Sequence, residues 1–251
     1  DYALRSICRE RSLMLGKQLI QAAAGAAGAG GDPVYVDDVF STYLWEGDSE
    51  ASQTITNGID LAGEGGLVWV KGRTVAYNNI LFDTERGNTS SLKGNTTDAA
   101  ETISTRVSGF LSNGFTVGSN GNVNAGSVDY ASWSFRKAPG FFDVVTYTGN
   151  GTAGRTVAHN LGSEPGMIIV KRYDATENWT VYHRSTGTSK FLFLDDTMAA
   201  QTASSAFWNN TAPTSTNFTV GTNGGVNASG GSYVAYVFAH DSQTFGTDSD
   251  E

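Results

Sequence analysis

Three histidines and one cysteine are the residues of this sequence best suited to metal binding or nucleophilic catalysis. His159, His183 and His240 lie far apart and form neither an H-x-H nor an H-E-x-x-H spacing. Cys8 is the single cysteine, which excludes an internal disulfide and a zinc site built from cysteines. The sequence also lacks a G-x-S-x-G motif and a P-loop. We therefore predict no catalytic residue, no cofactor and no bound metal.

Acidic pairs offer another route to chemistry. Asp83 and Glu85 lie two residues apart and would share one face of a strand, as a candidate carboxylate pair for glycoside hydrolysis. The neighbouring Arg86 favours a salt-bridged turn instead. Asp195 and Asp196, like the C-terminal DSDE, are candidate Ca²⁺ ligands, but such acidic pairs are usually just solvated. We rank a polysaccharide depolymerase last among three function hypotheses and expect that the protein is not an enzyme.

Tryptophans beside amide side chains suggest glycan binding, which needs aromatic faces for sugar rings and amides for hydroxyl groups. Trp179 lies in ENWTVYH, and Trp208 in AFWNNTAPT is followed by Asn209 and Asn210. Asn and Pro around Trp208 favour a loop, where a large exposed aromatic needs a functional reason. The alternative interpretation is that both tryptophans close the ends of a β-sandwich core. These four residues are the candidate glycan-binding residues.

Short β-strands are the elements expected to position these side chains. Charged residues make up 16% of the 251 residues, Gly is abundant, and 28 aromatic residues supply cores. Runs of β-branched and aromatic residues bounded by Gly, Asn or Ser predict strands. These strands are expected at 34–45, 66–72, 79–84, 115–118, 130–135, 141–149, 166–172, 179–184, 190–195, 218–221 and 233–238.

An internal repeat organises these strands into two groups. From Phe115 to Phe135, eleven of twenty-one positions are identical to the residues 103 positions later. Earlier matches extend the alignment: Asp38-Val39 with Asp143-Val144, and Leu81-Phe82 with Val181-Tyr182. The shared GxNGxVNA segment is expected to form a sharp turn between strands. In this alignment His183 replaces Asp83, which suggests a surface position.

In the last predicted strand of each copy, alternate side chains point to opposite faces of the sheet. Ala131, Trp133 and Phe135, with their equivalents in the second copy, are expected to form a buried face. Tyr130, Ser132 and Ser134 are expected to face water. Ala235 and Val237 on the equivalent second face are expected to be covered by the other copy or by a neighbouring subunit, which makes them oligomerisation candidates.

The first thirty residues have a helical pattern. Leu15 and Leu19 fall on one apolar stripe, which is a candidate for anchoring or oligomerisation, with packing on its own domain as the alternative. Met14 is an alternative natural start. We predict an all-β fold with two tandem β-sandwich modules, jelly-roll or lectin-like, related by internal duplication and preceded by a short helix. The expected parts are a helix and Ala/Gly connector at 1–31, modules at 32–139 and 140–241, and an acidic tail at 242–251.

Charge and hydropathy exclude two classes of partner. The net charge of −9 argues against nucleic acid, which binds basic surfaces. No stretch of eighteen apolar residues is present, so we expect no membrane insertion.

Five long motifs of this sequence resemble a domain of structural proteins from marine bacteriophages, including phages of cyanobacteria. They are VYVDDVFSTYLWEG, QTITNGIDLAGEGGLVWVKGR, FDTERG, YASWSFRKAPGFFDVVTYTGNGT and HNLGSEPGMIIVKR, and the resemblance covers residues 14 to 241. It implies a virion component, made in the host cytoplasm and displayed as a tail fibre or another external appendage.

The leading hypothesis is a fibre that takes part in attachment to a host-surface polysaccharide. The alternative is a capsid or tail decoration protein with a purely structural role, in which Ala235 and Val237 would be buried against another virion protein. We expect a homo-oligomer, with a trimer favoured, which contacts other virion proteins through the N-terminal helix. Several copies would convert weak sugar contacts into strong attachment.

Overall fold

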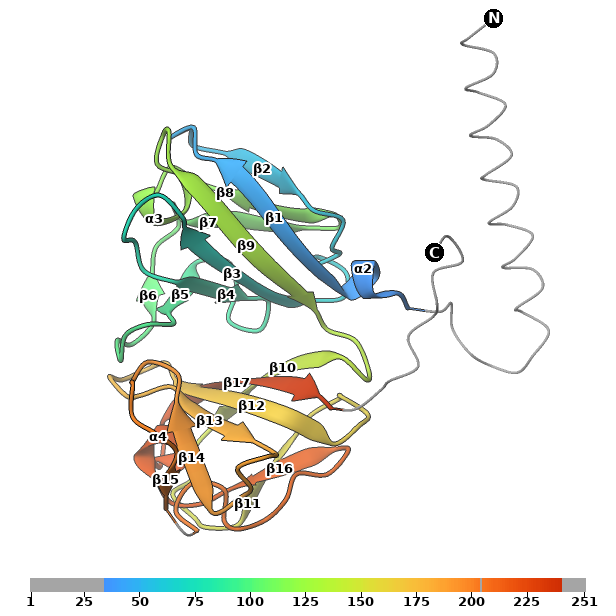
Figure 1. Ribbon diagram of the computed structural model, residues 1–251, viewed down its shortest axis with the longest axis vertical. Helices are drawn as coiled ribbons and strands as arrows, with labels where there is room; N and C mark the ends of the chain where they lie inside the picture. The colour runs from blue at the N-terminus through green and yellow to red at the C-terminus, as the bar shows by residue number, and fades with distance from the viewer. Residues whose placement is uncertain (1–33, 204, 241–251) are drawn as a thin grey trace, which may run out of the picture. The chain divides into compact units, whose positions relative to one another are not determined.

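The computed structural model describes residues 34–203 and 205–240. From Val36 onward these residues belong to one compact unit, Val36–Thr244. The expected N-terminal helix with Leu15 and Leu19, and the expected acidic tail, lie outside the described residues. Antiparallel strands dominate this unit, which confirms the all-β prediction (Figure 1). None of the helices in the described ranges has the length and hydropathy needed to cross a membrane.

The first half of the unit contains a six-stranded sheet and a three-stranded sheet. The order of the larger sheet is β1-β9-β3-β4-β5-β6, and that of the smaller is β2-β8-β7. The strands are β1 (Phe40–Glu46), β2 (Gln53–Thr56), β3 (Gly66–Gly72), β4 (Ile80–Asp83), β5 (Ser90–Lys93), β6 (Glu101–Thr102), β7 (Val107–Leu111), β8 (Gly114–Val117) and β9 (Asp129–Arg136).

The second half repeats the order of the larger sheet, as β10-β17-β12-β13-β14-β15, and adds the pair β11-β16. Its strands are β10 (Phe142–Thr148), β11 (Arg155–Ala158), β12 (Pro165–Arg172), β13 (Thr180–His183), β14 (Lys190–Phe193), β15 (Gln201–Thr202), β16 (Asn217–Val220) and β17 (Ser232–Ala239). The described residues also contain three four-residue helices: α2 (Val36–Val39), α3 (Gly121–Asn124) and α4 (Gly224–Asn227).

Three apolar cores alternate with the sheets. One core lies between the two sheets of the first half and contains Phe115 of β8 and Phe82 of β4. Another lies between the two sheets of the second half and contains Phe218 of β16. The third joins side chains of the two larger sheets, such as Leu81 of β4 and Ile169 of β12. The larger sheets are therefore buried on both faces, and we refer to this third core as the central layer.

The face assignment on β9 is wrong in one respect. Tyr130, Ser132 and Ser134 are fully buried rather than exposed to water. Asn57 donates a hydrogen bond from Nδ2 to the hydroxyl of Ser134 at 2.8 Å, which helps a small polar side chain to lie in the first-half core. Phe135, on the opposite face, packs in the central layer as expected for a buried face.

The start of the first copy also differs from the prediction. Residues 36–39 form the helical turn α2 rather than the beginning of a strand, with Asp37 and Asp38 in its first turn, where the helix dipole favours acidic side chains. Phe40 pairs with Phe135, and Phe142 pairs with Phe238. Phe142 therefore takes the place of Phe40, and the alignment of Asp38-Val39 with Asp143-Val144 is wrong.

The repeated GxNGxVNA segment forms α3 and α4, each capped by an asparagine. Asn223 accepts a hydrogen bond from the backbone of Gly225 at 2.8 Å. Tyr233 donates its hydroxyl proton to the carbonyl of Gly224 and accepts from the amide of Ala228. Tyr130 makes the equivalent contacts around α3. The segment is thus a short capped helix tied to the last strand of its half.

A buried asparagine in this segment fixes a distant loop. Asn227 donates from Nδ2 to the carbonyls of Gly221 at 2.7 Å and Thr152 at 2.9 Å, and its Oδ1 accepts from the amide of Asn150 at 2.9 Å. Asn124 makes comparable contacts with Asp48 and Glu50. Each half therefore uses the same amide to hold the loop that follows its first strand.

We expect Asn227→Ala to lower the free energy of unfolding by about 3 kcal/mol, because it leaves buried backbone groups without partners. Urea denaturation followed by fluorescence measures the change. Asn113→Ala, at an exposed position, is the control and should change stability by less than about 0.5 kcal/mol. Equal effects of the two substitutions would contradict a structural role for the Asn227 amide.

Candidate functional site

A buried ionic cluster joins the two halves. Arg86 donates from Nε to Asp83 Oδ2 at 2.7 Å, and the hydroxyl of Tyr236 in β17 donates to the same oxygen at 2.8 Å. The guanidinium also contacts Ser90 and lies over the ring of Tyr173. Burial, followed by the charge of Asp83, raises the pKa of Tyr236 well above its usual value. We call Asp83, Arg86 and Tyr236 the buried triad.

The buried triad changes the interpretation of the carboxylate pair. Asp83 is fully buried and accepts from the amide and the guanidinium of Arg86 and from the hydroxyl of Tyr236, which confirms the predicted salt bridge with Arg86. Glu85 instead is exposed and pairs with Lys137 at 2.7 Å. A sugar chain in solvent cannot contact Asp83 in this arrangement. The surface position inferred from the Asp83/His183 exchange is also wrong, because Asp83 faces the central layer.

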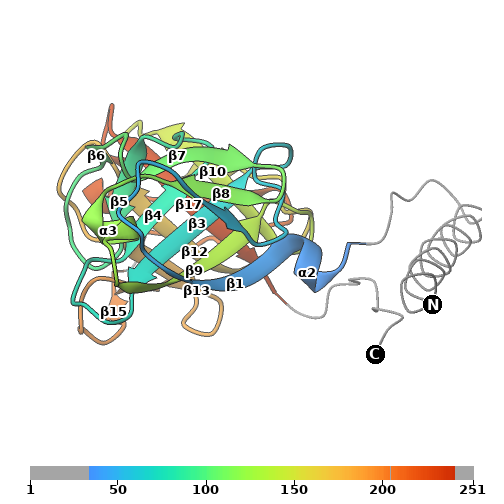
Figure 2. The ribbon, with the colours of Figure 1, turned by 90° about the horizontal axis from the view of Figure 1, so that it is seen from above.

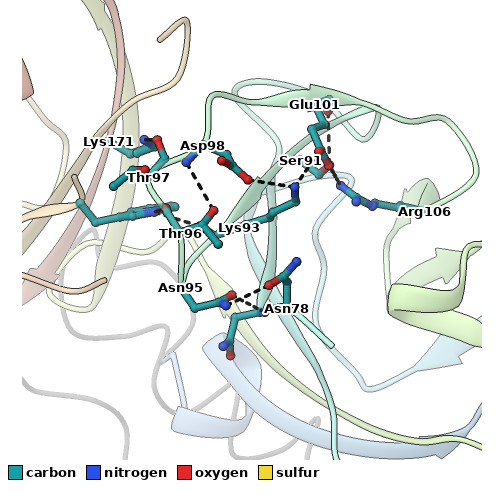
Figure 3. Close-up of polar contacts among 12 residues, drawn as sticks. Asn78, Ser91, Lys93, Asn95, Thr96, Thr97, Asp98, Glu101, Arg106 and Lys171 are labelled. Atoms are coloured by element: carbon teal, nitrogen blue, oxygen red, sulfur yellow. Dashed lines mark hydrogen bonds and ion pairs between the residues drawn. The ribbon is translucent and has the colours of Figure 1, made fainter. Parts of the chain in front are cut away.

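A second cluster clamps a loop of the first half against the second half (Figure 3). Lys171 of β12 donates from Nζ to the carbonyl of Thr97 at 2.9 Å, and Trp179 donates from Nε1 to the carbonyls of Lys93 at 3.0 Å and Thr96 at 3.1 Å. Two backbone hydrogen bonds join the same segments. The amide of Ala100 donates to the carbonyl of Tyr173, and the amide of Glu177 donates to the carbonyl of Thr97. Residues 94–100 are therefore held along their length, and we call this contact the loop clamp.

The base of this loop is fixed by ion pairs within the first half (Figure 3). Lys93 contacts Asp98 at 3.0 Å and Glu101 at 2.7 Å, and Arg106 contacts Glu101 at 2.8 Å. The hydrogen bond from Lys93 is the largest cause of a lowered pKa at Glu101. Arg106 also donates to Ser91 at 2.6 Å. The loop thus meets the second half in a defined conformation.

Sequence reasoning missed the loop clamp, although one signal was present. Lys71 and Lys171 both occupy strands that are otherwise almost entirely apolar, GLVWVKG and PGMIIVKR. A lysine in such a strand requires acceptors for its ammonium group. Lys71 finds them in its own half, at the carbonyls of Gly72 and Tyr77, both at 2.8 Å. Lys171 instead reaches a carbonyl of the other half.

Both candidate tryptophans are buried. Trp179 has no exposed surface and belongs to the central layer, and Trp208 is 2% exposed and packs edge-on against Tyr182. Neither ring has a free face on which a sugar could stack. Asn209 is half-buried and Asn210 exposed, both with left-handed φ, of 52° and 51°. The structure therefore supports the alternative interpretation, in which the tryptophans fill cores.

The oligomerisation candidates on β17 are internal as well. Ala235 and Val237 have no exposed surface and lie in the core of the second half, together with Tyr233. The expectation that another copy or subunit covers this face is wrong, because the half's own smaller sheet covers it.

The three histidines stay apart. His159 is buried, and burial lowers its pKa. The side chain of His183 accepts a hydrogen bond from the amide of Ser185, and His240 contacts Arg184. Across residues 34–203 and 205–240, no three His, Cys, Asp or Glu side chains gather as a metal-binding group.

An open depression lies on the surface of the first half. Its volume is about 520 Å³. Polar side chains line it together with one partly buried aromatic ring, Phe110 of β7. These polar residues are Glu64, Thr84, Glu85, Asn88 and Ser108. Asn88 is oriented by a 3.2 Å hydrogen bond to the carbonyl of Val107. We call this feature the polar depression, and sequence reasoning missed it because its residues come from three separate segments.

Comparison with protein families matches residues 36–246 to a domain of unknown function, DUF7483. Comparisons with curated proteins and with solved structures found no match. The matched range covers all the strands of both halves.

We expect Arg86→Met to lower the free energy of unfolding by about 3 to 5 kcal/mol, because it leaves the Asp83 carboxylate charged and buried. Tyr236→Phe removes one donor and should cost about 1.5 to 3 kcal/mol. Urea denaturation measures both changes. Tyr43→Phe, which alters an exposed hydroxyl, is the matched control and should be neutral. Stability unchanged in Arg86→Met would refute the role of the buried triad.

The loop clamp predicts a pH dependence. Burial lowers the pKa of Lys171 from 10.5 to about 8, so between these values the unfolded chain binds a proton that the folded chain has released. The contribution of Lys171 to stability therefore rises as pH increases through this window, by about 2 kcal/mol from pH 8 to pH 10.

The measurement is the free energy of unfolding of the wild type minus that of Lys171→Met, at pH 7, 8, 9 and 10. Taking the difference removes the contributions of other titrating groups, including the buried tyrosines. A difference that is flat or that falls with pH would contradict the lowered pKa of Lys171.

Proposed function

We propose that this chain, which belongs to the DUF7483 family, is a bacteriophage virion structural protein. Its role is that of a tail fibre or external appendage that takes part in attachment to glycans on the host surface. It assembles as a homo-oligomer and contacts other virion proteins through residues 1–31. The sequence resemblance to structural proteins of marine phages is the basis for the virion assignment.

The observation that carries the proposal is the interlocking of the two halves. The central layer, the buried triad and the loop clamp all join residues from both halves. Two halves joined in this way resist sliding, since a shift would leave the buried Asp83 carboxylate and the Lys171 side chain without their partners from the other half. Separation would also expose the apolar surface of the central layer. Such resistance suits an external appendage that bears force during attachment.

We further propose that the halves are two tandem β-sandwich modules derived by duplication. The equal strand order of the two larger sheets supports this, as do the equivalent roles of Tyr130 and Tyr233 and of Asn124 and Asn227. In each module a smaller sheet packs on one face of the larger sheet, in the manner of a sandwich with one wide and one narrow layer.

The polar depression is the surface on which we place the glycan contact. Phe110 offers an aromatic edge, and Glu64, Asn88 and Ser108 offer acceptors and donors for sugar hydroxyl groups. The buried tryptophans cannot serve in this role. An open site of this kind binds weakly, so that attachment depends on several copies acting together.

The decoration-protein alternative rested on Ala235 and Val237 being covered by another virion protein. Both lie in the core of their own half, so this argument for the alternative is lost. The intact particle distinguishes the two roles, because a fibre projects from the virion whereas a decoration protein lies flat on the capsid or tail.

The test is a glycan array of bacterial surface polysaccharides probed with the full chain, together with binding to cells of marine bacteria. Phe110→Ala should reduce binding roughly tenfold, because an aromatic contact is worth about 1 kcal/mol or more. Asn210→Ala, at one of the earlier candidate positions, is the control and should leave binding unchanged. The glycan role is overturned if the assembled protein binds neither the array nor cells. Loss of binding in Asn210→Ala alone would move the site to the loop that contains Asn210.

A further inference from the structure

Strand β1 forms an open edge of the first large sheet (Figure 2). All seven of its residues pair with β9 in continuous register, and among the described strands none pairs with its outer side. Natural sheets protect such edges with lysine, proline or a bulge. β1 has none of these, and its one charged residue is Glu46 at its end. This edge can therefore accept a further strand.

The middle of this edge is also apolar. Leu44 is 61% exposed and Tyr43 is 36% exposed, and both are among the most exposed large apolar residues of the described chain. Leu44 lies on the face of the first large sheet that contributes to the central layer. The buried residues of that layer include Leu67, Leu81 and Leu92 of this sheet, but no residue of β1. The second half therefore leaves the β1 side of this face uncovered.

The second half provides an internal comparison for this position. Phe40 and Phe142 pair with equivalent phenylalanines of β9 and β17, which makes Thr146 of β10 the equivalent of Leu44. Thr146 is exposed too. The same place on the same kind of edge strand thus carries a polar residue in one half and a leucine in the other. The fold does not require leucine there, and a leucine beside an unpaired strand edge is a residue that an added strand would cover.

We propose that β1 is a self-association surface, on which β1 of a second copy pairs antiparallel about a two-fold axis near Tyr43. The two first-half sheets then join into one continuous sheet. Leu44 of each copy lies beside Thr42 of the other and is removed from water. Glu46 lies opposite Phe40 of the second copy, so the pairing brings no like charges together.

The equivalent edge strand of the second half, β10, is a poorer partner for β1. On the face of β10 that corresponds to Leu44, Thr146 and Thr148 are exposed to solvent. The apolar residues on the same face, Phe142 and Val144, are already buried in the central layer. It therefore offers Leu44 no apolar complement. Two identical β1 edges complement each other better than β1 complements β10.

The test is the mass of the full chain in solution, measured by light scattering and by sedimentation equilibrium at about 1 to 100 μM, a range that covers micromolar association. Leu44→Lys places a charge on the edge, and Thr146→Lys is the matched control at the equivalent exposed position of β10. The wild type and Thr146→Lys should associate alike. Leu44→Lys should halve the mass of the assembly or raise its dissociation constant by at least about 100-fold.

Thermal unfolding checks that Leu44→Lys still folds, and amide hydrogen exchange gives an independent measurement. Residues 40–46 should become more protected as the wild-type concentration rises, and this dependence should disappear in Leu44→Lys. A wild type that stays monomeric over the whole range overturns the proposal. An assembly that Leu44→Lys leaves intact, such as a trimer formed through residues 1–31, overturns it as well.

Discussion

The buried carboxylate of Asp83 is the constraint on which the relation between the two halves depends. A charge within an apolar layer is tolerated only if donors surround it, and here the donors come from both halves: Arg86 from the first and Tyr236 from the second. Because a hydrogen bond tolerates only a few tenths of an ångström, the buried triad sets the register of one large sheet on the other. The apolar contacts around the buried triad supply the buried apolar area between the sheets, whereas the triad determines which alignment of the two sheets is stable.

The contacts within each half follow a common plan, and the contacts between the halves do not. Tyr130 and Tyr233 close their short helices in the same way, so each half specifies its own fold locally. At the junction, equivalent positions carry different residues. Asp83 is matched by His183 in the pairing of β4 and β13, and this exchange leaves one buried triad rather than two. The two halves are therefore complementary to each other rather than interchangeable.

Strands rich in β-branched and aromatic residues were predictable from the sequence, and short polar strands were not. Ten of the eleven predicted strands lie within two residues of the observed ones: β3, β4, β8, β9, β10, β12, β13, β14, β16 and β17. Shorter or more polar strands such as β5 and β6 carry too little signal in SSLK and ET. Ser134 and Trp208 were misplaced for a different reason. Their burial depends on partners distant in sequence, Asn57 and Tyr182, which no local pattern reveals.

The polar side chains that join the two halves are buried, so they are not available to other molecules. The two halves differ in the surfaces that remain exposed. The polar depression and the open edge of β1 both belong to the first half. In the second half, the large aromatic residues that sequence reasoning had assigned to ligands, Trp179 and Trp208, fill cores instead. Both surfaces that we propose for other molecules therefore lie on the first half, whereas the contacts that join the halves use residues of both. In the duplication proposed above, exposed residues of one copy could change without loss of stability, because the contacts that join the halves are buried.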